Sequence, residues 1–462
     1  MLSRVCILLA AASVVLVAQP ERRTVSLIVS GGTVVTMDRA GRVLSPGALA
    51  IDGRDIVGVD TPAAIGSRFS ARDTVDATGQ LVLPGLVNTH THAPMTLYRG
   101  LADDLALKAW LEQYIFPAEA KTVTPEFVRA GTRLAVLEMI QSGTTTYADM
   151  YYFEEEIARV TKEAGLRGVL GETIIQFPSP DAKTPAEGVA RAEAFIKEFE
   201  TDELIVPAIA PHAMYTLDTS TLKAIRAVAD RRRVPVLIHL AETKDEIATA
   251  RTRHKATPVG YLESIGFWGP RTLAAHGVWL SPADMAVLAR RRVGVAHNPE
   301  SNMKLASGAA DVVGMRRAGI PVGLGTDGAA SNNDLDMFEA MRQAAFLAKL
   351  HTMDPRALPA RTALEMATIE GARALGMESD IGSLEPGKRA DLIAVSTAAP
   401  RQVPMYDPFS HLVYVTRGDD VRTTIVNGRV LMRDRKILTL DEAEVLRESR
   451  AMADRVRAAV AK

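Results

Sequence analysis

The sequence predicts an α/β protein, a (β/α)8 TIM barrel with a small flanking β-sandwich domain formed by the N- and C-terminal segments. Eight apolar runs typical of strands lie between residues 81 and 328, and most are followed by a stretch with helical spacing of apolar residues. Short strands rich in Val and Ile precede and follow this region. A chain of 462 residues has room for one large barrel with such additions.

The first 18 residues have the pattern of a signal peptide. Arg4 precedes an apolar run from Val5 to Ala18, and polar residues follow. The run is short for a bilayer span, and no later run reaches that length, so we expect no membrane span in the mature chain. A leader would make the protein periplasmic or secreted. A misassigned start codon or a buried N-terminal segment is the alternative, and the protein would then be cytoplasmic.

Residues 24–80 and 382–436 predict one composite β-sandwich domain. Gly31-Gly32, Asp52-Gly53 and Asn427-Gly428 are typical of hairpin turns between short strands. Each flank alone is too short to bury a core, so we expect the two flanks to pair. Residues 441–462 predict an amphipathic C-terminal helix that Asp441 caps.

Residues 81–381 predict the barrel. Its expected strands are LVLPGLVNTHTH, GTTTYADM, LRGVLGETII, LIVPAIAPH, VPVLIHLAE, TLAAHGVWL, VGVAHNP and IPVGLGTDG. The intervening segments include PEFVRAGTRLAVLEMIQSG and STLKAIRAVADRR, in which apolar residues recur at helical spacing.

Composition excludes several classes of function. Lys and Arg total 54 against 55 Asp and Glu, a net charge of −1, so the chain lacks the basic excess that nucleic-acid binding needs. Cys6 is the one cysteine, so neither an internal disulfide nor a thiolate zinc site can form. Any metal must be bound by nitrogen and oxygen.

Chemically useful side chains stand where the expected strands end. His90 and His92 close the first run, His239 and His276 end two later runs, and Asp327 follows the last. Residues two apart on a strand face the same side, so His90 and His92 can reach one point. The carboxyl ends of parallel barrel strands meet at the mouth, where active sites of this architecture lie.

Three imidazoles and one carboxylate favour one divalent metal, with Zn²⁺ preferred and Fe²⁺ or Mn²⁺ as alternatives. Such a metal lowers the pKa of a water molecule that it binds. Glu242, three residues after His239, is a candidate for proton transfer, and His276 for stabilising charge on the attacked centre. We expect structural roles for the isolated histidines His254, His351 and His411.

The chain resembles the amidohydrolase superfamily over nearly its whole length. Within the superfamily it is most similar to the 5-methylthioadenosine/S-adenosylhomocysteine deaminase group. The motifs that carry the resemblance are LPGLVNTHTHAPMTLYRGLADDL, WLEQYIFPAEA, APHAMY, IHLAET, AAHGV, AHNPESNMKL and GLGTDGAASNN.

This resemblance implies hydrolytic deamination of an adenine nucleoside to the inosine derivative and ammonia. One metal would be bound by His90, His92, His239 and Asp327. Glu242 would be the proton shuttle and a substrate contact, His276 its catalytic neighbour, and Asp327 the acceptor of a proton from water. Two-metal members have a carboxylated lysine on a middle strand, and LRGVLGETII has none, which favours a single metal.

The substrate, a small-molecule nucleoside, would contact four further residues. The resemblance implies that Glu119 binds the ribose hydroxyls and that His212 and Ser331 contact the nucleoside. Trp110 would form an apolar wall of the pocket, or would simply pack the first barrel helix.

One position departs from relatives that process S-adenosylhomocysteine. Where they have an arginine for the amino-acid carboxylate, this chain has Glu172, which would repel that group. We therefore expect 5′-methylthioadenosine, adenosine or 5′-deoxyadenosine as substrate, unless Arg167 takes the role of the arginine.

The sequence leaves other functions open. The alternatives within the superfamily are a triazine chlorohydrolase, a guanine deaminase or a cyclic amidase, because the metal chemistry is shared. A non-catalytic, exported metal-binding protein for scavenging is a further alternative. The surface of such a barrel permits a homo-oligomer.

Overall fold

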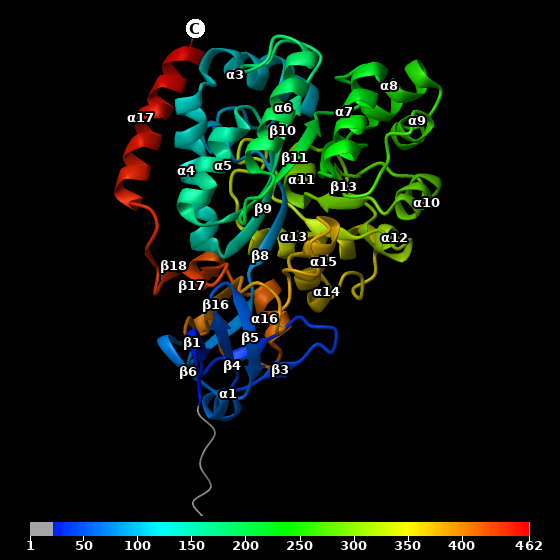
Figure 1. Ribbon diagram of the computed structural model, residues 1–462. Helices are drawn as coiled ribbons and strands as arrows, with labels where there is room; N and C mark the ends of the chain where they lie inside the picture. Colours follow the sequence, from blue (N-terminus) through cyan, green and yellow to red (C-terminus); the bar gives the residue numbers. More distant parts are fainter. Residues whose placement is uncertain (1–21, 462) are drawn as a thin grey trace, which may run out of the picture.

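The computed structural model describes residues 22–461 (Figure 1). The predicted signal peptide, residues 1–18, lies outside the described residues. In the part of the chain that is described, no helix is both long and apolar enough to cross a bilayer.

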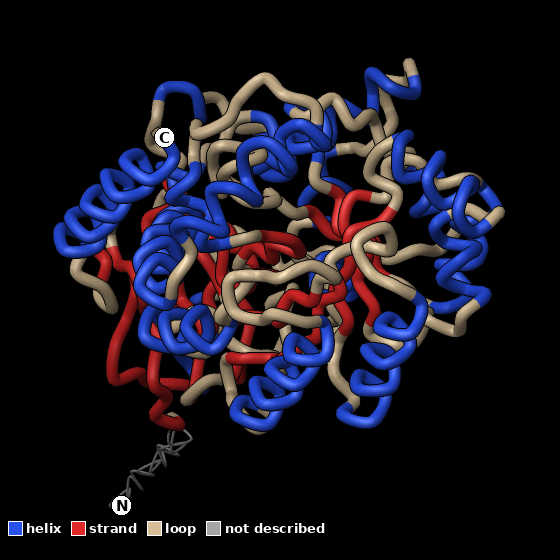
Figure 2. The backbone as a smooth tube through the Cα atoms, turned by 90° about the horizontal axis from the view of Figure 1, so that it is seen from above, coloured by secondary structure: helices blue, strands red, loops and turns tan. Residues whose placement is uncertain are grey.

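Eight parallel strands close into a barrel, which confirms the predicted fold. Their order around the barrel is β10-β11-β12-β13-β14-β15-β8-β9, and each corresponds to one of the eight apolar runs. Figure 2 shows these strands in the centre of the molecule with helices around them. The strands are β8 (Leu86–Thr91), β9 (Thr144–Tyr151), β10 (Arg167–Ile174), β11 (Ile205–Pro211), β12 (Val236–Leu240), β13 (Thr272–His276), β14 (Gly294–His297) and β15 (Val322–Leu324).

Eight helices of the barrel region begin at a side-chain cap. Thr124 accepts a hydrogen bond from the backbone N–H of Phe127 at the start of α4, which ends at Gly143 with a φ of 90°. The helices are α2 (Leu107–Ala109), the π-helix η2 (Trp110–Ile115), α3 (Phe116–Thr122), α4 (Pro125–Ser142), α5 (Glu154–Ala164), α6 (Pro185–Phe199), α7 (Thr219–Arg232), α8 (Lys244–His254), α9 (Pro258–Ser264), α10 (Pro282–Arg291), α11 (Pro299–Lys304), α12 (Val312–Arg317), α13 (Met337–Thr352), α14 (Ala360–Met366) and α15 (Ile369–Ala374), with a short 3₁₀ segment η1 (Ala93–Tyr98).

The inside of the barrel is a packed apolar core. Seven of the eight strands each contribute at least one buried residue to a single cluster, which only the inner face of a closed barrel allows. These residues include Val87, Ala148, Val169, Ala208, Leu237, Leu273 and Ala296. The polar strand-end residues therefore stand at the mouth, above a filled interior.

Two further sheets flank the barrel, as predicted. One has the order β5-β4-β1-β6, and the other has the order β19-β18-β17-β16-β7-β2-β3. The second sheet joins the two ends of the chain, because β16 pairs with β7. Apolar residues of both sheets form one cluster between them. The strands are β1 (Arg23–Ser30), β2 (Thr33–Val35), β3 (Val43–Leu44), β4 (Ala48–Asp52), β5 (Asp55–Asp60), β6 (Phe69–Asp76), β7 (Gln80–Pro84), β16 (Leu392–Ser396), β17 (Val421–Val426), β18 (Arg429–Arg433) and β19 (Lys436–Ile437), and the short helices of this region are α1 (Pro62–Arg68), α16 (Pro408–Tyr414), η3 (Pro400–Gln402) and η4 (Gly418–Asp420).

Two of the three predicted hairpin turns are present. Asn427-Gly428 joins β17 to β18 with positive φ at both residues, and β4 pairs with β5 across Gly53. The prediction for Gly31-Gly32 is wrong. Strands β1 and β2 belong to different sheets, so this pair carries the chain from one sheet to the other. Gly31 has a φ of 94°, a conformation that suits such a crossing as well as a hairpin.

The C-terminal helix α17 (Glu442–Val460) begins where predicted. Asp441 accepts a hydrogen bond from the backbone N–H of Glu444. In Figure 1 this helix (red) lies beside α4 on the outside of the barrel.

Candidate active site

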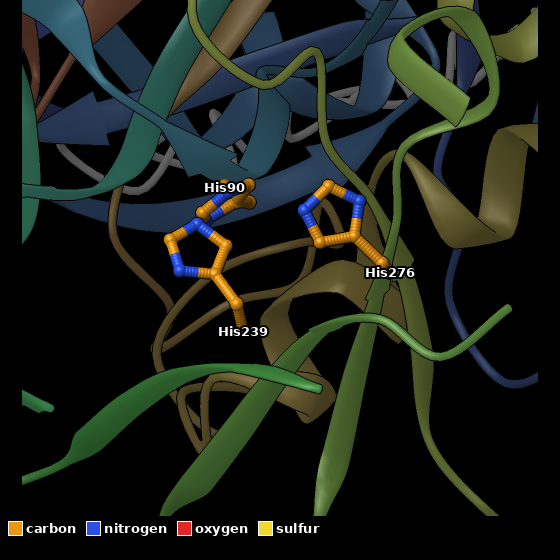
Figure 3. A group of neighbouring side chains, drawn as sticks. All are labelled: His90, His239 and His276. Carbon is orange, nitrogen blue, oxygen red and sulfur yellow. The ribbon is translucent and has the colours of Figure 1, made fainter. Parts of the chain in front are cut away.

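A cluster of imidazole and carboxylate groups lies at the mouth of the barrel. The ligand atoms of His90, His92 and Asp327 lie within 4.8 Å of one another, and so do those of His90, His239 and His276. Figure 3 shows the last three rings around a common space. The structure thus brings together five predicted residues that are far apart in the sequence.

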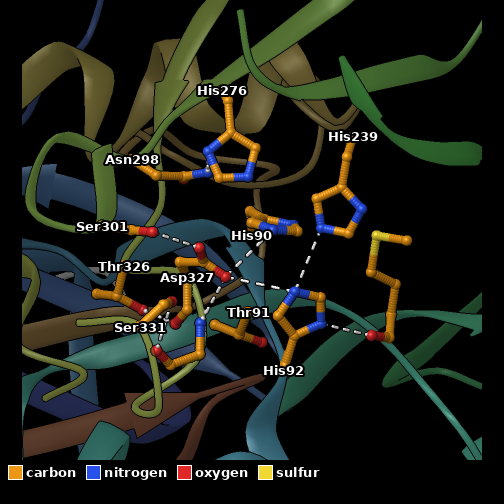
Figure 4. Close-up of polar contacts among 12 residues, drawn as sticks. His90, Thr91, His92, His239, His276, Asn298, Ser301, Thr326, Asp327 and Ser331 are labelled. Carbon is orange, nitrogen blue, oxygen red and sulfur yellow. Dashed lines mark hydrogen bonds and ion pairs between the residues drawn. The ribbon is translucent and has the colours of Figure 1, made fainter. Parts of the chain in front are cut away.

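Hydrogen bonds to backbone carbonyls fix the tautomers of two of these rings. His92 Nδ1 lies 2.7 Å from the carbonyl oxygen of Met150, and His239 Nδ1 lies 2.8 Å from that of His212. A carbonyl only accepts, so both Nδ1 atoms carry a proton, which in the neutral imidazole leaves the lone pair on Nε2. These Nε2 atoms lie 3.3 Å apart (Figure 4). Two lone pairs cannot bond to each other, so they require a cation between them.

His90 and Asp327 complete this arrangement. His90 Nε2 is buried without a hydrogen-bond partner, and Asp327 Oδ1 lies 3.5 Å from it and 3.3 Å from His92 Nε2. Burial lowers the pKa of His90 to about 4, which keeps the imidazole neutral. Three neutral nitrogens and a carboxylate oxygen facing one point fit a divalent metal with nitrogen and oxygen ligands.

The backbone at two of these residues is unusual. His276 has a φ of 76° and Asp327 a φ of 63°, left-handed conformations that are costly for residues with a side chain. Both precede a glycine, Gly277 and Gly328. At each strand end the chain turns sharply, and the side chain leaves the regular alternation of a strand. His92 also lies one residue beyond β8, next to irregular pairing of β8 with β9.

Glu242 faces the same cluster from the loop after β12. Its Oε2 atom lies 3.7 Å from His276 Nε2, and its Oε1 accepts a hydrogen bond from Ser307 at 3.2 Å. Burial raises the pKa of Glu242. Its backbone N–H donates to Glu246 at 3.0 Å, which anchors the loop. A carboxyl with a raised pKa beside a metal site is suited to moving protons.

Four residues of the cluster, His92, His239, His276 and Asp327, line a pocket that is partly open to solvent. Four of the five predicted substrate residues line the pocket: Trp110, Glu119, His212 and Glu242. The rest of the lining is mainly apolar and aromatic, including Leu107, Leu111, Ile115, Phe116, Tyr152 and Leu305. Within the described chain, the lining contains no lysine or arginine.

The segment from η2 to α3 covers this pocket. Glu119 accepts a hydrogen bond from the hydroxyl of Tyr151 at 2.8 Å, and burial raises its pKa to about 8. Trp110 is buried in η2, and its indole Nε1 has no hydrogen-bond partner. Both residues line the pocket, and each carries a polar group.

Of the two residues expected to contact the nucleoside, His212 lines the pocket and Ser331 does not. His212 follows β11 and lines the pocket, and burial lowers its pKa to about 3. Ser331 is buried in the loop after β15 and donates a hydrogen bond to the carbonyl of Gly328 at 3.1 Å, but it is not among the lining residues. It contacts the turn that follows Asp327.

The expectation for Glu172 is wrong. Its neighbour Thr173 lines the pocket, and successive residues of a strand point to opposite sides, so Glu172 points away. Glu172 accepts hydrogen bonds from Arg191 Nε at 3.0 Å and from the backbone N–H of Glu154 at 3.1 Å. Arg167 cannot replace an arginine of the pocket either, because it is buried at the opposite end of β10, paired with Asp391.

Sequence reasoning missed several residues of the site. Tyr151 and Thr173 line the pocket, and Ser301, Asn302 and Ser307 contact the side chains around the cluster. Ser301 and Asn302 belong to the motif AHNPESNMKL, and Ser307 lies two residues beyond its end. A motif by itself does not show which side chains its residues contact.

A barrel of this kind with such a cluster at its mouth defines a metal-dependent hydrolase. Residues 81–431 match the Amidohydrolase family, and the chain belongs to this family. The protein is therefore a hydrolase of the class that acts on C–N bonds.

Known proteins are similar over almost the whole chain. A 5-methylthioadenosine/S-adenosylhomocysteine deaminase of Syntrophobacter fumaroxidans is 48% identical over 427 residues, 92% of this chain and 97% of that protein. A 5′-deoxyadenosine deaminase of Methanosarcina mazei is 44% identical over 436 residues, 94% of this chain and 99% of that protein. The crystal structure of an adenosine deaminase from Xanthomonas campestris with bound zinc has a TM-score of 0.93 and 39% identity, covering 95% of this chain and 100% of that chain.

Proposed function

We propose that the protein deaminates an adenine nucleoside by hydrolysis, forming the inosine derivative and ammonia. The observation that carries the proposal is one pocket that is lined by residues of the imidazole–carboxylate cluster, by Glu242 and by Glu119. The relatives named as deaminases of methylthioadenosine and 5′-deoxyadenosine support this substrate class.

We propose that a single zinc ion is bound by His90, His92, His239 and Asp327, with Fe²⁺ or Mn²⁺ as alternatives. The facing lone pairs of His92 and His239 and the unpartnered Nε2 of His90 support this assignment, as does the zinc in the similar adenosine deaminase. The pocket lining of the described chain offers no lysine for a second metal. When bound, the metal lowers the pKa of a water molecule so that hydroxide is available near neutral pH.

Proton transfers by two carboxylates then drive the reaction. Asp327 accepts a proton from the attacking water. Glu242 donates a proton to the ring nitrogen N1 of the purine, which makes C6 electrophilic. The raised pKa of Glu242 favours the protonated carboxyl that this step needs.

The bond changes at C6 balance without another reactant. The water oxygen forms a bond to C6, and His276 stabilises the charge that develops on this oxygen. Asp327 passes the proton that it took from water to the amine, and Glu242 regains a proton from the C6 hydroxyl as the C6=O bond forms. The C6–N6 bond breaks, and ammonia leaves. The product is the 6-oxopurine nucleoside.

The other side of the pocket binds the sugar. Glu119 accepts hydrogen bonds from ribose hydroxyls, and His212 and Trp110 contact the nucleoside. Because the lining combines apolar side chains with carboxylates and has no lysine or arginine among the described residues, we propose an uncharged 5′-substituent. A free amino-acid carboxylate would be desolvated there without a counter-charge.

A coupled ammonia assay tests this function. It compares adenosine, 5′-methylthioadenosine, 5′-deoxyadenosine and S-adenosylhomocysteine, with metal analysis of the same sample. Ammonia release from at least one nucleoside, lost on chelation and restored by Zn²⁺, is the expected result. Chloride release from a chlorotriazine, ammonia from guanine or ring opening of a cyclic amide instead would assign another reaction of the family. Bound metal with no hydrolysis of any compound would support a binding protein.

A further inference from the structure

A short segment at the mouth of the barrel contacts three side chains of the proposed reaction. It consists of residues 301–307, the end of α11 and the loop that follows. Ser301 and Asn302 are fully buried and Ser307 nearly so. Each donates or accepts a hydrogen bond with a different residue of the site.

Ser301 contacts Asp327. Its hydroxyl donates to Asp327 Oδ2 at 2.7 Å (Figure 4). The other oxygen, Oδ1, faces His90 and His92 and accepts from the backbone N–H of Gly328 at 2.7 Å. Ser301 therefore fixes the rotation of a carboxylate whose two oxygens have different tasks.

Asn302 contacts His276. Its Oδ1 lies 2.9 Å from His276 Nδ1, and an amide oxygen only accepts. This contact keeps a proton on Nδ1 and turns the other nitrogen, Nε2, toward Glu242 at 3.7 Å. Asn298 Nδ2 also approaches Nδ1, at the longer distance of 3.3 Å, so Asn302, the closer partner, determines the tautomer and the orientation of the ring.

Ser307 contacts Glu242. Its hydroxyl donates to Glu242 Oε1 at 3.2 Å, which leaves Oε2 toward His276. The segment itself is anchored, because Lys304 between these residues contacts Asp103 Oδ1 at 2.6 Å and Asn333. One rigid stretch of chain thus reaches three residues that come from three different strand ends.

We propose that Ser301, Asn302 and Ser307 are positioning residues that orient Asp327, His276 and Glu242 for the reaction. This inference rests on the proposed function for its kinetic part. It assigns to each residue a separate consequence, because each contacts a different partner. Ser301 acts on metal binding, Asn302 on the tautomer of His276, and Ser307 on the proton shuttle.

Three single variants separate these roles in the full-length zinc-loaded protein. Ser301→Ala should weaken zinc affinity about 10- to 100-fold, measured by competition with a chelator. Asn302→Leu should lower kcat about 10- to 100-fold with KM and zinc affinity unchanged. Asn302→Asp keeps the acceptor oxygen, so its kcat should be close to that of the wild type. Ser307→Ala should lower kcat about fivefold.

A matched control separates positioning from general stability. Ser449 on α17 is also a buried serine, but its hydroxyl has no hydrogen-bond partner, so Ser449→Ala should leave zinc affinity and kcat unchanged. Thermal midpoints are recorded for every variant. The inference would be overturned if all three variants had a lower thermal midpoint and lower activity together, without a loss of zinc affinity specific to Ser301→Ala and a loss of kcat specific to Asn302→Leu and Ser307→Ala. The segment would then have a merely structural role.

Two readouts do not depend on turnover. Zinc affinity of Ser301→Ala needs no substrate, and the nitrogen chemical shifts of histidine-labelled protein report the tautomer of His276. In Asn302→Leu these shifts should move toward a mixture of tautomers. If the protein deaminates no nucleoside but both effects appear, the proposed function fails and the positioning roles stand. If deamination is observed and both effects are absent, the positioning roles fail.

Discussion

At the mouth of the barrel, His90 Nε2, Trp110 Nε1 and Thr173 Oγ1 are buried without a hydrogen-bond partner. At its base, the buried guanidinium of Arg167 has four hydrogen bonds: two to Asp391, at 3.1 and 3.2 Å, one to the carbonyl of Glu203 and one to a side-chain oxygen. The same strand, β10, carries Arg167 at one end and Thr173 at the other. On this one strand, a buried polar group has no partner at the mouth end, whereas the buried polar group at the base end is hydrogen-bonded.

This difference separates function from stability. A buried polar atom without a partner costs about 1–3 kcal/mol, so the mouth has retained groups that the free protein would be better without. A ligand that supplies the missing partners explains their presence. At the base of β10 there is no such deficit, because the guanidinium of Arg167 is paired, although the hydroxyls of Thr144 and Thr145 at the start of β9 are also buried without a partner. Substitutions at the mouth should change binding and catalysis with little loss of stability. Substitutions at the base should lower stability with little change in binding and catalysis.

The largest effect should come from Glu242→Gln at the mouth. Removing the proposed proton shuttle should lower kcat by about 10²- to 10⁴-fold, measured in the ammonia assay, with zinc content and thermal midpoint near those of the wild type. Glu172→Gln is the control, a buried carboxyl that points away from the pocket. It should lose stability and keep kcat. Near-normal turnover of Glu242→Gln on every substrate would refute the role of Glu242.

The base should give the opposite result. Arg167→Met leaves Asp391 buried without its cation, and should lower the free energy of unfolding by about 3–5 kcal/mol while the folded fraction keeps its kcat. Denaturant titration with activity measurements checks both parts. Arg433→Met is the control, because its pair with Asp73 is exposed and should contribute less than about 1 kcal/mol. Loss of kcat in folded Arg167→Met would contradict the separation of the two ends.

The barrel was predictable because its signals are local. Each strand is an apolar run, and the polar residues that end these runs meet because parallel strands in a barrel point the same way. The convergence of His90, His92, His239 and Asp327 follows from this rule and from the resemblance of the motifs to a known superfamily. The pairing of β7 with β16 agrees with the expectation that the two flanks form one domain.

The wrong predictions concern where side chains point and which strands pair, and neither is determined by local sequence. Whether Glu172 faces the pocket depends on one residue of register in β10, and similarity of motifs does not fix that register. The left-handed backbone of His276 and Asp327 redirects their side chains at the strand ends. The crossing at Gly31-Gly32 depends on long-range pairing of β2 with β7. Contacts of residues 301–307 likewise join distant parts of the chain.

The substrate panel sharpens the description of the mouth. With an apolar lining and no described lysine or arginine in it, kcat/KM for 5′-methylthioadenosine or 5′-deoxyadenosine should exceed that for S-adenosylhomocysteine by about tenfold or more. Leu111→Arg adds a cation to the lining, so it should lower the ratio of these kcat/KM values. Equal kcat/KM values in the wild type would show that the amino-acid group finds a partner elsewhere.

The smallest expected effect concerns Trp110. Trp110→Phe keeps an aromatic wall but removes the indole N–H, which has no partner in the free protein. If this N–H binds the nucleoside, KM should rise about three- to tenfold, whereas the thermal midpoint should stay the same or rise, because an unsatisfied donor is removed.

Trp268 is a matched control for this substitution. Both indoles are 5% exposed, but Trp268 Nε1 donates to the carbonyl of Val259 at 3.1 Å. Trp268→Phe should therefore lower the midpoint and leave KM unchanged. An unchanged KM in Trp110→Phe would mean that Trp110 is an apolar wall only, and would weaken the argument that unpartnered polar atoms at the mouth mark contacts with the ligand.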